Sequence, residues 1–182
     1  MQAAIELFKK SGFQNVSIEE ITTAAEVSRG SFYVYYKNKD DLLAAYLLSL
    51  DENYYGYYQT VLCGPECAGK SCLEKLSRYM KYSMKVLSEC GPDLLRVYYA
   101  YLTRDTNAWA TKDRSYFPIL ETLLHSGQED GCIRRDISIE QLESMSLCLT
   151  RGLTLEWCAS PEPIPIESKF PVIDSFCHML QP

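Results

Sequence analysis

The sequence lacks the features of a membrane-spanning or secreted protein. No apolar run among its 182 residues approaches the ~20 residues that a transmembrane helix needs. The opening residues, Met1 to Ala4, lack the charged and apolar regions of a signal peptide. We therefore expect a cytoplasmic protein with no membrane partner.

Histidine is scarce, which leaves few candidates for a catalytic base. The chain holds only His125 and His178, and neither has a Ser, Cys or carboxylate partner at a diagnostic spacing. We expect no catalytic residue, no enzymatic activity and no cofactor.

A basic excess is also missing, although domains that bind nucleic acid usually carry one. The net charge is −6. Among residues 1–50, six acidic residues outnumber five basic ones, but three of the basic ones, Arg29, Lys37 and Lys39, lie close together. A net negative charge on the rest of the chain would keep non-specific DNA binding weak.

Tight CxxC pairs are absent despite a high cysteine count. The chain has eight cysteines, and without a secretion signal the default is free thiols. Cys63, Cys67 and Cys72 cluster around glycine and proline, with spacings that do not match a structural zinc site. We expect no metal; a redox or metal-sensing role for these three is the alternative.

One segment formally fits a phosphate-binding loop. Residues 64–71, GPECAGKS, match GxxxxGK[ST]. The mechanism of that loop needs a buried strand before it, whereas the preceding residues continue a helical pattern. We interpret the match as chance.

The most informative stretch contains two short helix signals in succession, residues 17–25 and 28–36. Ser17 with Glu20 forms a capping box, and Ser28 offers a second N-cap. The spacing of Phe32, Tyr35 and Tyr36 gives the second helix an apolar side. Two short helices joined by a tight turn, the second opening with small, hydroxyl and cationic residues, suit the DNA major groove.

This stretch resembles the DNA-binding domain of TetR-family transcriptional regulators. The matching positions are Phe8, Gly12, Phe13, Val16, Ser17, Ile18, Ile21, Ala25, Val27 to Tyr33, Tyr36 and Asn38 to Leu42. The resemblance implies an all-α fold, with a three-helix helix-turn-helix domain over residues 1–46. A helical ligand-binding and dimerisation domain would follow over residues 47–182. The first helix is shortened here, so a basic N-terminal arm cannot be carried over.

Apolar periodicity supports helices throughout and no strand. The expected helices cover residues 2–11, 40–62, 71–89, 93–105, 113–130, 138–158 and 167–180. Gly12 is expected to end the first helix in the left-handed conformation.

The resemblance assigns DNA contacts to the second helix and its flanks. Arg29 would read guanine, Gly30 would permit close approach, and Val34 would touch a thymine methyl. Ser31 and Tyr33 suit phosphate contacts, while Ser17 and Lys39 would clamp the backbone on either side. The full DNA-binding set is Ser17, Ser28, Arg29, Gly30, Ser31, Tyr33, Val34 and Lys39.

Pairing of two copies would place two recognition helices on a palindromic operator. The last two long helices have apolar faces suited to a four-helix bundle, unless those faces only close the monomer's own core. The expected homodimer contacts are Leu142, Met145, Leu149, Gly152, Leu153, Phe170, Ile173, Phe176 and Leu180.

Many large aromatic side chains in the middle helices suit an apolar ligand cavity. The candidate ligand-binding residues are Tyr58, Tyr79, Tyr82, Tyr98, Tyr101, Trp109, Tyr116, Phe117 and Trp157. A small-molecule ligand there would tilt the helix at 40–62 and change the separation of the two recognition helices.

The sequence therefore predicts a homodimeric repressor that a small-molecule inducer releases from palindromic DNA. Three alternatives stay open. The chain is a regulator without an inducer, or an activator; it is a sensor or scaffold that has lost DNA binding; or it is a thiol- or metal-responsive regulator.

Overall fold

The computed structural model describes residues 1–104, 116–161 and 164–182, and within these ranges the chain is helical with no strand. This agrees with the all-α prediction. The α-helices are α1 (Gln2–Ser11), α2 (Ile18–Ala24), α3 (Arg29–Tyr35), α4 (Lys39–Ser49), α5 (Asp51–Tyr57), α6 (Cys72–Ser88), α7 (Pro92–Arg104), α8 (Tyr116–Glu129), α9 (Ile139–Ala159) and α10 (Phe170–Met179). Short turns of 3₁₀ or π helix cover Phe13–Asn15, Tyr58–Leu62, Pro65–Cys67 and Ile166–Lys169.

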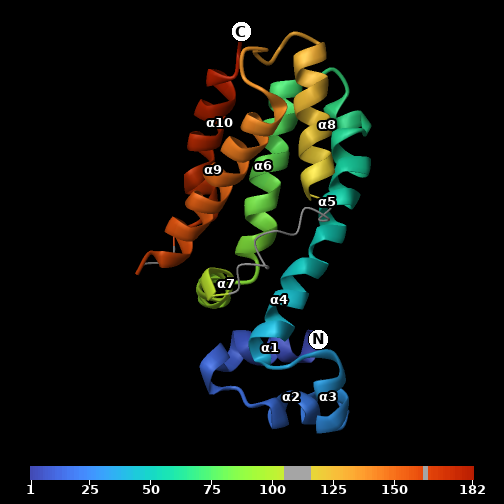
Figure 1. Cartoon of the computed structure of the whole chain (residues 1–182), viewed down its shortest axis with the longest axis vertical. Coiled ribbons are helices and arrows are strands. Elements are labelled where there is room, and N and C mark those ends of the chain that lie inside the picture. The colour runs from blue at the N-terminus through green and yellow to red at the C-terminus, as the bar shows by residue number, and fades with distance from the viewer. Residues whose placement is uncertain (105–115, 162–163) are drawn as a thin grey trace.

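The helices form a small group and a larger group. Helices α1, α2 and α3 gather at one end of the molecule, and α4 leads from them toward the larger group (Figure 1). There α6 packs against α8, α9 and α10. Helix α7 lies at the junction, where it contacts α4 on one side and α9 on the other. The helix-turn-helix unit is thus presented at the tip, away from the bundle.

Side-chain caps fix where the main helices begin. The Ser17 hydroxyl accepts a hydrogen bond from the Glu20 amide, and the Glu20 carboxylate accepts one from the Ser17 amide at 2.7 Å. These bonds with Ser17 also lower the pKa of Glu20. The same box opens α6 and α9, so the predicted boundaries at these helices are confirmed. Such caps each stabilise a helix by about 1 kcal/mol.

The expected single helix over residues 40–62 is divided, which corrects the prediction. Helix α4 ends at Ser49, Leu50 is its C-cap, and α5 begins at Asp51 with acidic residues in its first turn. After α5 the chain widens into a π turn, in which the Cys63 amide donates to the Tyr58 carbonyl at 2.9 Å. Gly64 closes this turn against the Thr60 carbonyl, where a side chain would collide. The connection between the two groups is therefore segmented.

The structure also bears on the predictions for Gly12 and for the GPECAGKS segment. Gly12 ends α1 with a positive φ of 82°, but its ψ of 141° is extended rather than left-handed helical. In the GPECAGKS segment, Lys70 pairs with Glu74 at 3.0 Å, and Ser71 caps α6. A π turn, not a strand, precedes the segment. The local structure therefore lacks the context of a phosphate loop.

The turn between α2 and α3 carries the one described non-glycine residue with positive φ, Glu26 at 54°. The turn is closed by hydrogen bonds from the Glu26 amide to the Thr23 carbonyl and from the Val27 amide to the Thr22 carbonyl. Left-handed backbone costs an L-residue roughly 1–2 kcal/mol, and glycine escapes that cost.

Replacing Glu26 with glycine should therefore stabilise the protein. We expect Glu26→Gly to raise the free energy of unfolding by about 1 kcal/mol and Tm by roughly 2–4 °C. The matched control is Glu19→Gly within α2, which should lower stability by about 1 kcal/mol. Thermal denaturation followed by circular dichroism measures both, and equal losses in the two variants would contradict this account of the turn.

Candidate DNA-binding surface and ligand cavity

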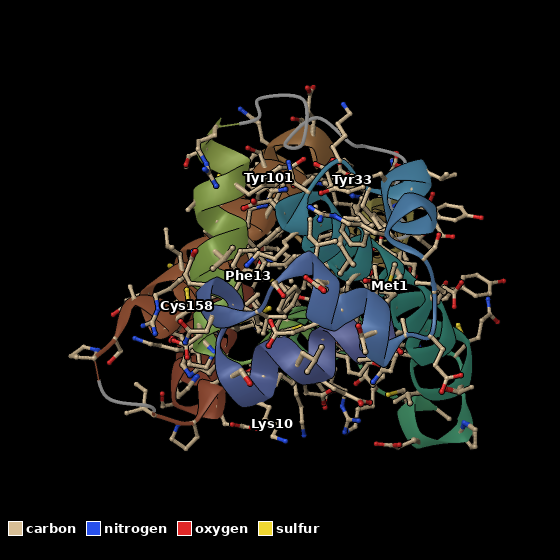
Figure 2. The ribbon with its side chains drawn as sticks, turned by 90° about the horizontal axis from the view of Figure 1, so that it is seen from below. Met1, Lys10, Phe13, Tyr33, Tyr101 and Cys158 are labelled. Atoms are coloured by element: carbon tan, nitrogen blue, oxygen red, sulfur yellow. A yellow bond between two sulfur atoms is a disulfide. The ribbon has the colours of Figure 1, made fainter. Side chains whose placement is uncertain are left out.

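Helix α3 is held by one buried side chain and exposes most of the rest. The Ser28 hydroxyl accepts from the Ser31 amide at 3.0 Å, which starts the helix. Phe32 is 5% exposed and Tyr36 is half-buried, so these two fix the helix to the domain. Val34 is 76% exposed. Figure 2, which views the molecule from below, shows Tyr33 on this outer side.

Tyr35 does not join the apolar side as the sequence pattern predicted. It is 78% exposed. The helix ends at Tyr35, and Tyr36 is already extended, with φ −136° and ψ 131°. The apolar side of α3 is therefore narrower than the spacing suggests.

Arg29 stands at the exposed start of α3 with its side chain partly ordered by a neighbour. Its guanidinium carbon lies 5.9 Å from the centre of the Tyr33 ring. A hydrogen bond with the Tyr33 side chain is the main reason that the pKa of Arg29 is raised. Ser28 and Ser31 are likewise engaged, with their hydroxyl oxygens 2.8 Å apart.

Lys39 differs from the expected phosphate clamp. Its ammonium donates to the Phe13 carbonyl at 2.7 Å and to the Val16 carbonyl at 2.5 Å. The same nitrogen lies 4.8 Å from the centre of the Phe13 ring. Two of its three N–H donors therefore bind the start of α4 to the turn that precedes α2. The ammonium group thus stabilises the fold of the small helix group. Sequence patterns do not reveal this role because the hydrogen-bond acceptors are backbone carbonyls 23 and 26 residues away.

The small helix group is attached to the bundle by contacts that the sequence pattern did not reveal. Lys9 on α1 donates to the Glu89 carbonyl at 2.9 Å, at the end of α6. Arg104 on α7 pairs with Asp40 on α4 at 3.3 Å. Lys9 is thus a link between the two groups rather than a residue of the DNA-facing side.

A small cavity lies among α5, α6, α8 and α9. Its volume is about 50 Å³. Its lining consists of Tyr54, Ser83, Leu87, Tyr116, Phe117, Leu147, Thr150, Arg151 and Thr154. Behind it the tyrosines pack on one another: Tyr79 stacks on Tyr116 with centres 5.3 Å apart, and the Tyr79 hydroxyl donates to the Tyr116 carbonyl at 3.0 Å.

Only some of the predicted ligand residues meet at this cavity. Tyr116 and Phe117 line it, Tyr79 and Tyr82 belong to the adjoining aromatic cluster, and Tyr54 was missed. The remaining described candidates, Tyr58, Tyr98, Tyr101 and Trp157, do not line it. Trp157 instead donates its indole N–H to the Ile164 carbonyl at 2.6 Å. Trp109 lies outside the described residues.

Two surface grooves flank the cavity and share residues with it. The groove between α8 and α9 has a volume of about 490 Å³, shares Phe117 and Leu147, and carries Glu121, Glu140 and Glu143. The groove between α7 and α9, of about 480 Å³, shares Arg151 and is mainly apolar. Both grooves are large enough to admit part of an organic ligand.

The predicted dimer contacts on α9 and α10 are largely on the wrong side of their helices. Buried within the chain's own core are Leu142, Leu153, Ile173, Phe176 and Leu180. Phe170 and Leu149 are half-buried. An exposed stripe follows a different register, through Met145, Cys148, Gly152 and Leu155 on α9 and through Val172 and Met179 on α10. The buried leucines satisfied the same 3–4-residue spacing, which does not tell one side of a helix from the other.

Two other features, a membrane-spanning helix and a metal-binding cluster, are absent from the described residues. In those parts of the chain, no helix combines the length and the apolar character needed to cross a bilayer. The same residues include no group of three His, Cys, Asp or Glu side chains placed to hold a metal ion.

Residues 1–46 match the family described as "Bacterial regulatory proteins, tetR family". Among curated proteins, the Tn10 TetC protein of Escherichia coli is 51% identical over 39 residues, which is 21% of this chain and 20% of that protein. The HTH-type transcriptional regulator YuxN of Bacillus subtilis, itself uncharacterized, is 34% identical over 55 residues, 30% of this chain and 17% of the relative. The aligned segments thus span about a fifth of these relatives.

Solved structures extend the likeness to the whole fold. FadR from Thermus thermophilus, a repressor solved with lauroyl-CoA, aligns with a TM-score of 0.71 and 24% identity over 97% of this chain and 90% of that one. FadR from Bacillus halodurans aligns with a TM-score of 0.75 and 18% identity over the same shares. Identities this low show the fold alone. Residues 1–46, with their exposed helix-turn-helix, therefore belong to the family of bacterial regulatory proteins of the TetR type, and the whole chain shares the fold of solved TetR-family regulators.

Proposed function

We propose that this chain is a homodimeric repressor that binds palindromic operator DNA and releases it when a small apolar ligand opens the cavity. The observation that carries the proposal is the exposure of α3 at the tip of the molecule (Figure 1). A recognition helix must reach the groove without obstruction from its own protein. The DNA-binding unit would be residues 1–46 and the ligand-binding unit residues 47–182, with their boundary inside α4.

Base-specific contacts with DNA would come from the first turn of α3. Arg29 is exposed and held beside Tyr33, so its guanidinium can reach guanine O6 and N7 at little entropic cost. Gly30 allows the backbone to approach, and Val34 presents an apolar surface to a thymine methyl. Ser17, Ser28, Ser31 and Tyr33 would serve phosphates around it. Lys39 would contribute mainly by fixing the domain, with one donor left for a phosphate.

Dimerisation would use the exposed stripe on α9 and α10 defined above. Among the described residues, none comes within 4 Å of the position that a Cβ on Gly152 would take, so a second helix can approach it closely. The apolar side chains around it lie at intervals of three or four residues, as a helix-to-helix contact requires. Two copies joined there would carry two α3 helices, which favours an operator with twofold symmetry.

The ligand would be a molecule with an apolar or aromatic part that enlarges the cavity when it binds. A drug-sized pocket occupies roughly 300–1,000 Å³, whereas this cavity measures about 50 Å³. Binding must therefore displace the surrounding helices, including α6. Two FadR neighbours were solved with lauroyl-CoA and stearoyl-CoA, so acyl-CoA is the first ligand class to test here.

A displacement of α6 would act directly on the DNA-binding unit. Ser83 and Leu87 on α6 line the cavity, and Glu89, next to the end of the same helix, accepts the hydrogen bond from Lys9 on α1. A ligand that moves α6 would therefore bias the position of α1. Such a ligand shifts the equilibrium only as far as it prefers the released state.

Arg29→Ala should relax the sequence preference of DNA binding. Loss of a bidentate guanine contact removes roughly 1–3 kcal/mol of discrimination at one base pair of each half-site. The measurement is selection from a random DNA pool, followed by gel shift of the selected site and its single-base variants. Lys10→Ala, an exposed cation on α1, is the matched control and should keep the preference. A wild-type protein without any salt-dependent shift would instead favour a sensor that has lost DNA binding.

Leu155→Glu should separate the dimer. A carboxylate within this apolar stripe must be buried without a partner in both copies, which we expect to weaken association by about 3 kcal/mol, or roughly 100-fold. Leu48→Glu on α4 is the control, because Leu48 is similarly exposed but lies off the stripe. Sedimentation velocity distinguishes the outcomes: a Leu155→Glu protein that stays dimeric removes this interface from the proposal.

Thr150→Leu should make the repressor insensitive to its inducer. Thr150 is buried on the cavity wall, and its hydroxyl donates to the Ser146 carbonyl at 2.9 Å. Leucine fills the space, whereas Thr150→Val keeps the volume and serves as the control. Lauroyl-CoA is titrated into each protein–DNA complex and release is followed by fluorescence anisotropy. We expect at least a roughly tenfold weaker response for Thr150→Leu alone; an unchanged response would place the ligand elsewhere.

A further inference from the structure

Two cysteines that are far apart in the sequence meet at the distal end of the bundle. Cys72 and Cys132 form a disulfide across a sequence separation of 60 residues, with their Cα atoms 6.7 Å apart. That separation lies within the range that a disulfide spans. The other six cysteines of the chain are free thiols. The sequence pattern had grouped Cys72 with Cys63 and Cys67 instead.

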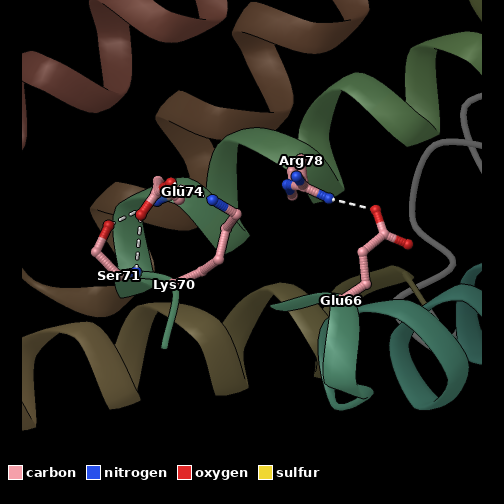
Figure 3. A network of polar contacts seen from close by, with 5 residues as sticks. All are labelled: Glu66, Lys70, Ser71, Glu74 and Arg78. Carbon is pink, nitrogen blue, oxygen red and sulfur yellow. Dashed lines mark hydrogen bonds and ion pairs between the residues drawn. The ribbon is translucent and has the colours of Figure 1, made fainter. Parts of the chain in front are cut away.

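Cys72 is positioned by the start of α6. It is the first residue of the helix, directly after Ser71, whose hydroxyl accepts from the Glu74 amide at 3.2 Å. The Glu74 carboxylate accepts in return from the Ser71 amide and from Lys70 (Figure 3). These bonds lower the pKa of Glu74 to about 2. The cap therefore fixes the backbone of Cys72 whether or not its sulfur is bonded.

Cys132 is positioned independently by the turn after α8. Its amide and that of Ile133 both donate to the Gly127 carbonyl at 2.9 Å. Ile133 is buried against Gly127, where a side chain would collide with it. The two cysteines are therefore held opposite one another by contacts that do not involve the disulfide, so reduced thiols would stay within reach of each other.

We propose that Cys72 and Cys132 form a reversible disulfide switch that responds to hydroperoxides. Cys72 lies at the positive end of a 17-residue helix, which stabilises a thiolate, and Cys132 is half-exposed. Disulfides in a reducing cytoplasm are usually transient and redox-sensing rather than structural.

The chemistry balances with one oxidant molecule. One thiolate attacks the O–O bond of a hydroperoxide ROOH, giving a sulfenic acid and, after protonation, the alcohol ROH. The second thiol attacks that sulfur, forming the S–S bond and expelling water. Reduction consumes two molecules of glutathione, which leave as glutathione disulfide and return two thiols to the protein.

The bond ties together two helices that line the ligand cavity, at the ends of those helices that lie farther from it. It joins the first turn of α6 to the turn that follows α8, and both helices line the cavity. This consequence rests on the proposed function: since a ligand must part these helices, the oxidised protein should resist opening and hold its operator more firmly against the inducer.

The first test concerns the thiols alone and needs neither DNA nor ligand. The full chain is treated with hydrogen peroxide or with glutathione at millimolar concentration, and free thiols are counted by alkylation and mass spectrometry. We expect peroxide to remove two thiols, mapped to Cys72 and Cys132, and glutathione to restore them. Reduction should lower Tm by on the order of 10 °C, because the closed loop is long.

Matched variants separate the pair from the other thiols. In Cys132→Ser and, independently, in Cys72→Ala, Tm should no longer depend on the redox state. Cys63→Ser, which removes an exposed free thiol away from the proposed dimer stripe, should behave like the wild type. A pair that stays bonded in millimolar glutathione, or that peroxide does not close, overturns the switch.

The second test asks whether the bond acts on regulation. Release of DNA by lauroyl-CoA is measured for the oxidised and reduced wild type and for Cys132→Ser. We expect at least a threefold weaker response in the oxidised wild type only; equal responses overturn the regulatory part. If neither form binds DNA, the proposed function fails, and the thiol measurements still decide whether the switch exists.

Discussion

The arrangement depends on α4 being buried in both parts of the molecule. Leu42, Leu43 and Leu47 are each 1% exposed. The helix begins beside the turn that Lys39 holds and continues to α7, which it contacts along its side. Burial on two sides leaves α4 little freedom to rotate on its own. The direction in which α3 points is consequently set by the packing of α4 against the bundle.

The sequence was sufficient for the helix-turn-helix unit because its signals are local. The capping pairs at Ser17 and Ser28 and the buried Phe32 all act within a few residues, and the structure has them as expected. The fold class followed from periodicity for the same reason. The break at Leu50 was missed because no proline or glycine marks it.

Side-chain partners over long distances could not be predicted. Lys9 and Lys39 use backbone carbonyls that are 80 and 26 residues away as acceptors, and any residue type supplies a carbonyl. The pairing of Cys72 with Cys132 likewise depends on how α6 and α8 meet. On α9 the exposed side could not be predicted because leucines occur on both sides, and the packing of α6, α7 and α8 against this helix decides which side is inner.

The near closure of the aromatic cavity affects how sensitive such a regulator can be. When only a fraction of molecules is open, the measured dissociation constant exceeds the intrinsic one by the inverse of that fraction. An opening cost of about 2 kcal/mol would thus reduce sensitivity roughly 30-fold. In the proposed repressor, the same cost would keep the gene silent when no ligand is present. Substitutions that loosen the stacked tyrosines would weaken repression but lower the ligand concentration at which the protein responds. A biosensor built on this chain would need that adjustment.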